Sequence, residues 1–196
     1  GKAKLAPALS LVAVLDIEVR GRQNDLQRLS DARVVQTFEG LSHRYARMRA
    51  AGLALRQVRA TARHGLAEPG LFRCLVALLD RLSSAEEDEL PSIQSAFEAR
   101  LLSHMGMAPE LDRCVRCQRP APEDRRVTVD VRHDGVVCQS CGGGTYALDA
   151  AARRALQLQL ARETSYSADL PGSVRTLTRA LVERHLPEVP LERGAL

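Results

Sequence analysis

The chain has 196 residues, of which 45% are apolar and 27% are charged, and its formal net charge is +4. This composition excludes an intrinsically disordered tail, whose apolar content is lower. No stretch approaches the roughly 20 uncharged apolar residues that cross a bilayer, and no signal peptide opens the chain, so we expect neither a membrane span nor secretion. The net charge is too small to imply an anionic partner by itself, so the distribution of charge carries more information.

The N-terminal residues read as the end of a β-domain. Residues 9–20 are rich in Val, and apolar and charged side chains alternate over their second half: Leu15, Asp16, Ile17, Glu18, Val19 and Arg20. This alternation predicts a strand that is buried on one face. Because the chain begins with Gly1 and not with Met, we expect that the natural protein starts earlier.

From about Ser30 the spacing of apolar residues changes to every third or fourth position, the period of a buried helical stripe. The pattern predicts a helix that continues to about Arg63 and ends at His64 and Gly65. The stripe consists of Val34, Val35, Phe38, Leu41, Tyr45 and Met48.

Two more helices are predicted before residue 109. Pro69 opens the first, which is apolar on most faces and is therefore expected to be the central helix. A charged connection, 83–91, follows it. Ser92 can cap the second helix, and Gly106 is expected to end it.

Residues 110–146 have a different character, because four of the five cysteines lie there in two CxxC pairs separated by twenty residues. The Asp134-Gly135 step suits a tight turn that would bring the two pairs together. Four thiolates complete the tetrahedral shell of Zn²⁺ and leave no position for water. The pattern therefore predicts one structural Zn²⁺, whose binding energy is folding energy for the module. The predicted ligands are Cys114, Cys117, Cys138 and Cys141.

Other uses of these cysteines fit less well. A redox CxxC usually occurs singly beside a βαβ pattern, and iron–sulfur ferredoxins have different spacings. An odd cysteine count without a secretory signal indicates a reducing compartment. His133 lies between the pairs, but four cysteines already fill the shell. Cys74 lies in an apolar helix and is expected to be core packing.

The last fifty residues predict two helices. Asp149 can cap the first, and the second ends near the C-terminus. Their apolar positions are Leu156, Leu158 and Leu160 in one and Val174, Leu177, Leu181 and Val182 in the other.

Between Gly40 and Ala67 there are six arginines and no acid. Four of them share one arc of a helix, beside an apolar arc expected to face the core that contains Met48, Ala51, Leu55, Val58 and Ala62. Such a row is suited to a nucleic-acid backbone, and the candidate contacts are Arg49, Arg56, Arg59 and Arg63. The alternative is a solvated face whose charges pair with acids such as those at 86–89.

Catalysis is not indicated. The chain has no phosphate-binding glycine loop of the GxxxxGK[ST] or GxGxxG type, and neither GxSxG nor HExxH occurs. A zinc deaminase would need an open coordination position and an HxE-type motif. We therefore expect a protein that is not an enzyme.

The order of these features resembles the RecO family of bacterial recombination mediators. The most specific part is FEARLLSHMGMAPELDRCVRC at 97–117, and the second CxxC pair stands in GVVCQSCGGG at 135–144. EPGLFRCLVALLDRL at 68–82 resembles a helix of the family that begins with Pro and an LF pair. Gln118 departs from the family, in which Gly often follows the first pair, and is expected only to stiffen the turn.

The resemblance implies a mainly α fold: a helical bundle with an inserted four-cysteine, zinc-ribbon-like module, preceded by a β remnant of an OB-fold that is largely missing from this chain. The expected limits are 1–29 for the end of the OB-fold domain and 30–109 for the helical domain. They are 110–146 for the zinc module and 147–196 for C-terminal helices packing on the helical domain.

The resemblance also implies a cytoplasmic, nucleoid-associated protein of DNA repair. It would bind single- and double-stranded DNA and anneal complementary strands. It would engage the C-terminal tail of the single-strand-binding protein and act with RecR to load RecA. The alternative is a zinc-stabilised interaction scaffold that docks a partner peptide and has no direct DNA role.

Overall fold

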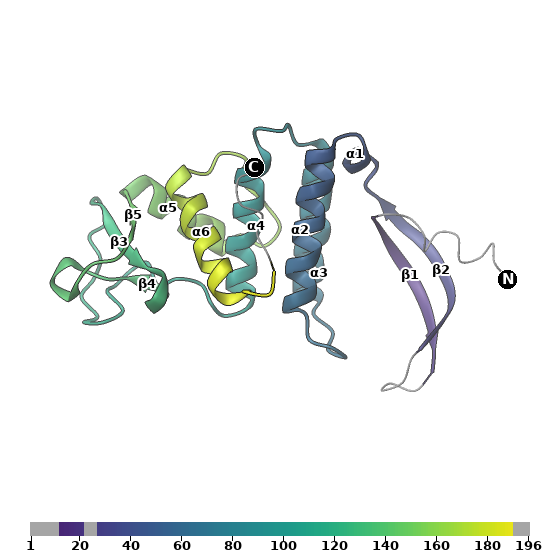
Figure 1. Ribbon diagram of the computed structural model, residues 1–196, viewed down its shortest axis with the longest axis horizontal. Coiled ribbons are helices and arrows are strands. Elements are labelled where there is room, and N and C mark those ends of the chain that lie inside the picture. The colour runs from purple at the N-terminus through teal and green to yellow at the C-terminus, as the bar shows by residue number, and fades with distance from the viewer. Residues whose placement is uncertain (1–11, 22–26, 190–196) are drawn as a thin grey trace.

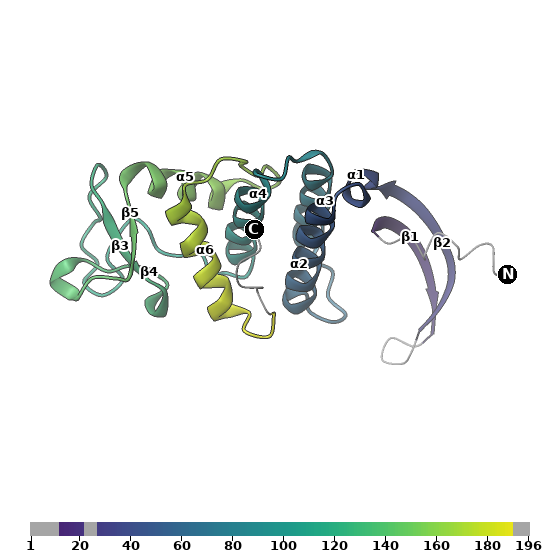
Figure 2. The same ribbon diagram turned by 45° about the horizontal axis from the view of Figure 1, so that its top comes forward.

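The computed structural model describes residues 12–21 and 27–189. Its elements lie in a row: a two-stranded hairpin at one end, a group of helices in the middle and a small three-stranded sheet at the other end (Figure 1). The order is the same after a turn of 45° (Figure 2), so the hairpin and the small sheet are on opposite sides of the helices.

The hairpin consists of β1 (Ala13–Arg20) and β2 (Arg28–Thr37), which pair antiparallel with Ile17 opposite Ala32. The predicted helix from Ser30 is therefore wrong up to Thr37. Backbone pairing with β1 and the β-branched Val34 and Val35 favour a strand there, so the helical spacing of the apolar residues is coincidental. The expected domain limit at residue 29 falls inside β2.

The prediction that one face of β1 is buried is wrong for its second half, since Ile17 and Val19 are exposed, as is Val35 on β2. A two-stranded hairpin is marginally stable by itself. The origin of the hairpin in a larger β-domain stays a prediction. The assignment of that domain to an OB-fold remains a prediction.

The part of the chain that the structure describes contains six α-helices beside two small antiparallel sheets, so the expectation of a mainly helical chain is confirmed in part. Pro69 begins a helix as predicted, and Gly106 follows the end of another with a left-handed φ of 73°. Asp149 caps a third by accepting a hydrogen bond from the Ala152 N–H at 2.7 Å. The helices are α1 (Glu39–Ser42), α2 (Tyr45–Thr61), α3 (Pro69–Ser84), α4 (Leu90–His104), α5 (Ala150–Ala161) and α6 (Gly172–His185).

The centre of the bundle is α4 and not α3 as predicted. Every residue at 92–99 is buried, because α2, α3, α5 and α6 all pack around this helix, whereas α3 exposes Phe72 and Asp80. Polar residues on α4 hide its central position from a hydrophobicity pattern. Ser92 is one of them: it does not cap α4, which begins at Leu90, but accepts a hydrogen bond from the Leu170 N–H at 3.2 Å.

A buried polar cluster joins α2 to α4. The Gln57 side-chain amide donates to Glu98 Oε1 at 2.9 Å, and the Gln94 amide donates to Gln57 Oε1 at 3.0 Å. Burial raises the pKa of Glu98, and the hydrogen bonds from Gln57 and Gln94 oppose that rise. The α2–α4 contact is thus held by one carboxyl group and two amides in an otherwise apolar core.

The small sheet has the order β4-β3-β5, formed by β3 (Val127–Asp130), β4 (Gly135–Val136) and β5 (Tyr146–Leu148), all antiparallel. The predicted turn between β3 and β4 is present. Asp134 adopts the left-handed φ of 50°, whereas Gly135 already belongs to β4. No helix in the described ranges has both the length and the apolar character of a membrane span.

Glu98→Gln tests the buried carboxyl. Because folding raises its pKa, this carboxyl contributes stability that is full below its ordinary value of 4.5 and is lost as the pH rises through the raised pKa. Glutamine has no proton to lose and keeps an acceptor for Gln57. The variant should therefore be more stable than the wild type at pH 8, and the difference should shrink toward pH 4, as measured by urea unfolding. Equal stability of the two proteins at pH 8 would contradict this; the exposed Glu123→Gln is the control.

Candidate metal centre and nucleic-acid interface

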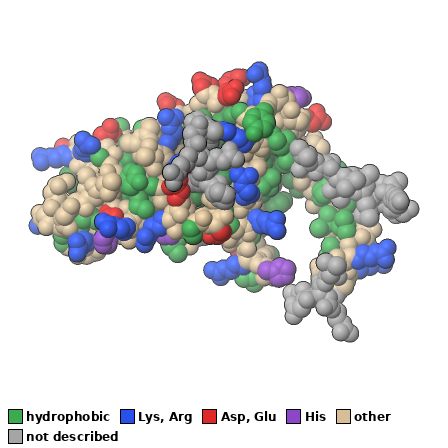
Figure 3. Space-filling view, viewed as in Figure 1, with side chains coloured by type: hydrophobic (Ala, Val, Ile, Leu, Met, Phe, Trp, Pro, Cys, Tyr) green, Lys and Arg blue, Asp and Glu red, His purple; other side chains and the backbone are tan. Residues whose placement is uncertain are grey.

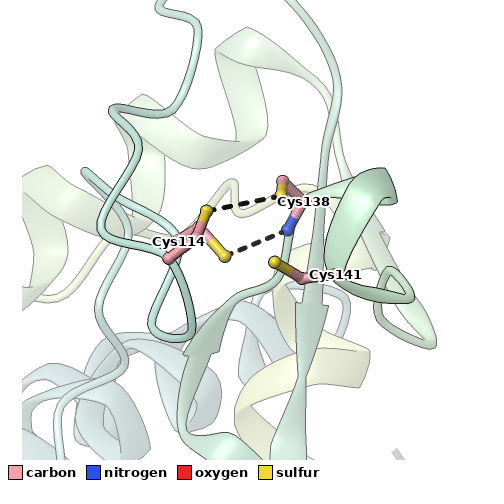
Figure 4. Close-up of side chains that lie close together, drawn as sticks. Cys114, Cys138 and Cys141 are labelled. Atoms are coloured by element: carbon pink, nitrogen blue, oxygen red, sulfur yellow. Dashed lines mark hydrogen bonds between the residues drawn. The ribbon is translucent and has the colours of Figure 1, made fainter.

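The four cysteines of the two CxxC pairs meet in one cluster. The sulfur atoms of Cys114, Cys117, Cys138 and Cys141 all lie within 4.8 Å of one another. Cys117 Sγ and Cys138 Sγ are 3.7 Å apart. A tetrahedral ion with sulfur ligands at about 2.3 Å places those ligands about 3.8 Å apart. Figure 4 shows the sulfurs of Cys114, Cys138 and Cys141 turned toward one another. The cluster can therefore hold one metal ion without rearrangement of the backbone.

Two tight turns present these sulfurs. In the first, the Gln118 N–H donates to the Cys114 carbonyl at 2.8 Å, and the Cys114 N–H donates to the Arg119 carbonyl at 2.9 Å. Gln118 has a φ of 60°, a left-handed conformation that glycine adopts without strain. In the second turn, the Cys141 N–H donates to the Cys138 carbonyl at 2.9 Å, and Gly142 follows with a φ of 105°.

Gly135 lets the first turn approach β4. A Cβ atom at this position would come within 2.5 Å of Val115 Cγ1 and 2.9 Å of the Glu110 carbonyl oxygen. The absence of a side chain allows the first turn to hydrogen-bond to β4: the Val115 N–H donates to the Val136 carbonyl at 2.9 Å. The sequence predicted this glycine for its backbone freedom, but its function is close packing.

The protonation of the cluster indicates why a cation fits it. Hydrogen bonds from the backbone N–H groups of Cys138 and Cys117 lower the pKa of Cys114 to about 6. The neighbouring cysteine side chains, foremost Cys138, raise the pKa of Cys141 to about 12. Without a cation, the Cys141 thiol keeps its proton mainly through hydrogen bonds with Cys138 and Cys117, and the charge on Cys114 makes a smaller contribution. A divalent ion displaces such protons, since it deprotonates thiols that bind to it.

Two other candidate ligands lie elsewhere. His133 Nδ1 is hydrogen-bonded to Asp130 Oδ2 at 2.8 Å. Cys74 is buried on α3, where its thiol donates to the Glu163 carbonyl at 3.1 Å. Neither residue belongs to the cysteine cluster.

Three residues of the predicted arginine row, Arg49, Arg56 and Arg59, lie on α2, on the side opposite its buried residues, whereas Arg63 follows the end of the helix at Thr61. Arg56, Arg59 and Arg63 are exposed, and Arg49 is half-buried. Figure 3 shows Lys and Arg side chains along the position of α2. The buried residues of this helix are Ala50, Ala51, Ala54 and Gln57.

The apolar arc predicted for α2 is therefore partly wrong: Leu55 is 37% exposed and Ala62 is exposed. The face of α2 that carries its buried alanines and Gln57 packs against α4 instead. Alanines permit a close approach of the two helices, and the Gln57 side chain hydrogen-bonds to Glu98. Compared with the predicted orientation, α2 is rotated about its axis, so that Arg56 and Arg59 lie opposite the buried face and not beside it.

Among the described residues, the acids at 86–89 do not pair with Arg56 or Arg59. Glu89 Oε1 pairs with Arg81 at 2.7 Å, and Glu89 Oε2 accepts the Glu86 N–H at 2.8 Å, contacts that lower the pKa of Glu89. Within residues 12–21 and 27–189, no ion pair or hydrogen bond engages the side chain of Arg56 or Arg59. The guanidinium groups of these two residues are thus available to an external anion.

A pocket between α2, α4 and α6 was missed by the sequence analysis. Its volume is about 240 Å³, and it is lined by Leu53, Pro91, Gln94, Ser95, Glu98, Arg175, Thr176 and Arg179. Gln94 Oε1, which is buried, has no hydrogen-bond partner among the residues that the structure describes. The signal in the sequence was the polar pair Gln94 and Glu98, one turn apart in a helix whose other positions are mostly apolar.

Comparison with known sequences gives a consistent result. A sequence model of the family described as "Recombination protein O C terminal" matches residues 42–193. A DNA repair protein RecO from Anaeromyxobacter sp. strain K is 33% identical over 144 residues, which cover 73% of this chain and 56% of the relative. Another, from Anaeromyxobacter dehalogenans strain 2CP-C, is 31% identical over 195 residues, covering 94% of this chain and 76% of the relative.

A third relative, the DNA repair protein RecO of Pelobacter propionicus, is 32% identical over 145 residues. These residues cover 72% of this chain and 56% of the relative. The chain thus spans little more than half the length of two of these three relatives.

Proposed function

Since the chain belongs to the RecO family of DNA repair proteins, we propose that it is a DNA-binding recombination mediator whose helical part contacts DNA through the exposed arginine face of α2. The observation that supports this most directly is the lack of any ion pair on Arg56 and Arg59 within the described ranges. Uncompensated guanidinium groups bind phosphates and release the counterions condensed on DNA.

In this proposal the protein makes and breaks no covalent bond. Basic surfaces screen the repulsion between phosphates, so that complementary strands can approach and anneal. The proposal also includes cooperation with RecR to load RecA onto single-stranded DNA coated by the single-strand-binding protein. Family membership supports these partners, and the β1–β2 hairpin is proposed as the end of the OB-fold domain of the longer protein.

We propose further that the cysteine cluster binds one structural Zn²⁺. The four ligands are thiolates, their mutual distances fit a tetrahedral ion, and they leave no position for substrate. The ion would hold together a module with a sheet of only three short strands.

The pocket between α2, α4 and α6 supports a second candidate function, the docking of an acidic peptide tail. Arg175 lies on its wall and suits a carboxylate, while Leu53 and Pro91 supply an apolar surface. Arg179, one turn further along α6, is ion-paired with Glu183 at 3.3 Å. The Gln94 oxygen offers an acceptor for a peptide N–H. The tail of the single-strand-binding protein is the proposed occupant.

Replacing Arg56 and Arg59 together by Glu should weaken binding of single-stranded DNA at least tenfold at about 100 mM salt, since two phosphate contacts become repulsive. The slope of log affinity against log salt should become shallower by about 1.4, at 0.7 for each phosphate. Fluorescence anisotropy with a labelled oligonucleotide measures both. The control is the same charge change at Arg154 and Arg162, exposed residues in and just after α5. Unchanged affinity in the α2 variant would refute its role.

Cys138→Ser should abolish the binding of one equivalent of zinc and destabilise the cysteine module. The free energy of unfolding should fall by several kcal/mol, and the melting temperature should fall by about 2–4 °C for each kcal/mol. Metal analysis and thermal unfolding measure the two effects. Cys74→Ser changes a cysteine outside the cluster and should keep the full zinc content. A Cys138 variant with unchanged metal content and melting temperature would show that the module needs no ion.

Arg175→Glu should reduce the affinity for a peptide with an acidic C-terminal end by about tenfold or more, because it replaces an attractive charge on the pocket wall by a repulsive one. Calorimetric titration measures the binding. Arg154→Glu, away from the pocket, should leave it unchanged. If Arg175→Glu binds the peptide as the wild type does, the tail docks elsewhere.

A further inference from the structure

We propose that Tyr45 makes the arginine face of α2 selective for single-stranded over double-stranded DNA, because its ring stacks on an unpaired base. This inference rests on the proposed DNA contact of α2 and adds to it a residue that reads the bases. The preceding proposal involves phosphates alone, which both forms of DNA present.

The side chain of Tyr45 is open to solvent. It is 82% exposed at the first position of α2, whereas tyrosines generally bury the body of the ring. Tyr166 shows the ordinary arrangement: it packs edge-on against Phe97, with 6.1 Å between ring centroids, and its hydroxyl donates to the Cys74 carbonyl at 2.8 Å. Among the described residues, the Tyr45 ring has no such aromatic neighbour.

The position of Tyr45 along α2 places it in line with the arginines. At 100° per residue, Arg56 is three turns further along and about 20° away in angle, and Arg59 is four turns along and about 40° away. The rise of about 1.5 Å per residue separates Tyr45 from these two residues by about 16 and 21 Å. An extended strand of several nucleotides spans this distance, with phosphates on the arginines and one base on the ring.

The charges near the start of α2 are mixed. Arg44 and Arg47 line a small cavity there together with Glu86 and Glu87. The ring of Tyr45 is neutral and offers a flat face to a neutral base, whereas Arg56 and Arg59 suit the phosphates of the backbone. The arginines therefore hold the backbone, and the aromatic contact is made at the first turn of the helix.

Stacking of this kind requires a single strand. In a duplex each base lies between its neighbours, so its flat face is not accessible to a side chain without unstacking. On single strands, contact between a base and an aromatic ring contributes about 1–3 kcal/mol by alanine substitution. At 1.4 kcal/mol for each factor of ten, this corresponds to about 5- to 100-fold in affinity.

The test compares Tyr45→Ala with the wild-type chain on three probes of equal length: oligothymidine, a duplex, and an oligonucleotide of abasic sites that keeps the phosphates. The affinity of the variant for oligothymidine should fall about 5- to 100-fold. Its affinities for the duplex and the abasic strand should stay within about twofold. Tyr45→Phe keeps a ring and should bind like the wild type, and Phe72→Ala removes an exposed ring from α3 and should also have no effect.

Two results would overturn the proposal: oligothymidine affinity unchanged within twofold, or an equal loss on the abasic strand. Because Tyr45 is exposed, the melting temperature should be unchanged, which verifies that the variant is folded. The proposed contact between the arginines and DNA is tested separately from the stacking contact of Tyr45. If the paired Arg56 and Arg59 variant binds all three probes normally while Tyr45→Ala loses oligothymidine, the arginine contact is wrong and the stacking contact stands.

Discussion

The burial of α4 on all sides is the constraint on which the other features depend. Residues 92–99 are closed off by four helices, so each of those helices has one face fixed against α4. For α2 the fixed face is formed by alanines and Gln57, whose amide bonds to Glu98 at 2.9 Å. The arginines and Tyr45 consequently point into solvent. The same packing leaves the pocket at which Gln94, Glu98 and Arg175 meet.

The cysteine module packs apolar side chains, among them Val127, Val129 and Val136, into the same core as the helices, and polar contacts also attach it to the C-terminal helices. His185 Nε2 lies 2.8 Å from Asp134 Oδ1, and the Arg153 guanidinium donates to the Pro122 carbonyl at 2.7 Å. These contacts join the module to α6 and α5, which themselves pack on α4. Metal binding by the cluster would therefore stabilise the end of the molecule that contains the small sheet, away from the exposed arginines of α2. Metal binding and DNA binding can thus be tested with separate variants.

Local chemistry in the sequence predicted much of this arrangement. Pro69, Gly106 and Asp149 marked helix ends because each acts through its own backbone or side chain, and the CxxC spacing predicted a cluster that the structure contains. Errors arose where tertiary contacts decide. Residues 30–37 form a strand because β1 supplies their hydrogen-bond partners. The helix α4 is central although four of its eleven buried residues are polar. The rotation of α2 toward α4 depends on Gln57 and Glu98, 41 residues apart, a pairing that no helical pattern contains.

The measurement that tests the central claim most directly is the affinity of the unmodified 196-residue chain for labelled single-stranded DNA at a series of salt concentrations. Four exposed arginines lie on α2 or next to its ends: Arg44 just before the helix, Arg56 and Arg59 on it, and Arg63 just after it. With about 0.7 for each neutralised phosphate, log affinity should fall against log salt with a slope of about −2 to −3. No binding at low salt, or a slope near zero, would contradict a DNA contact on the helical part of this protein.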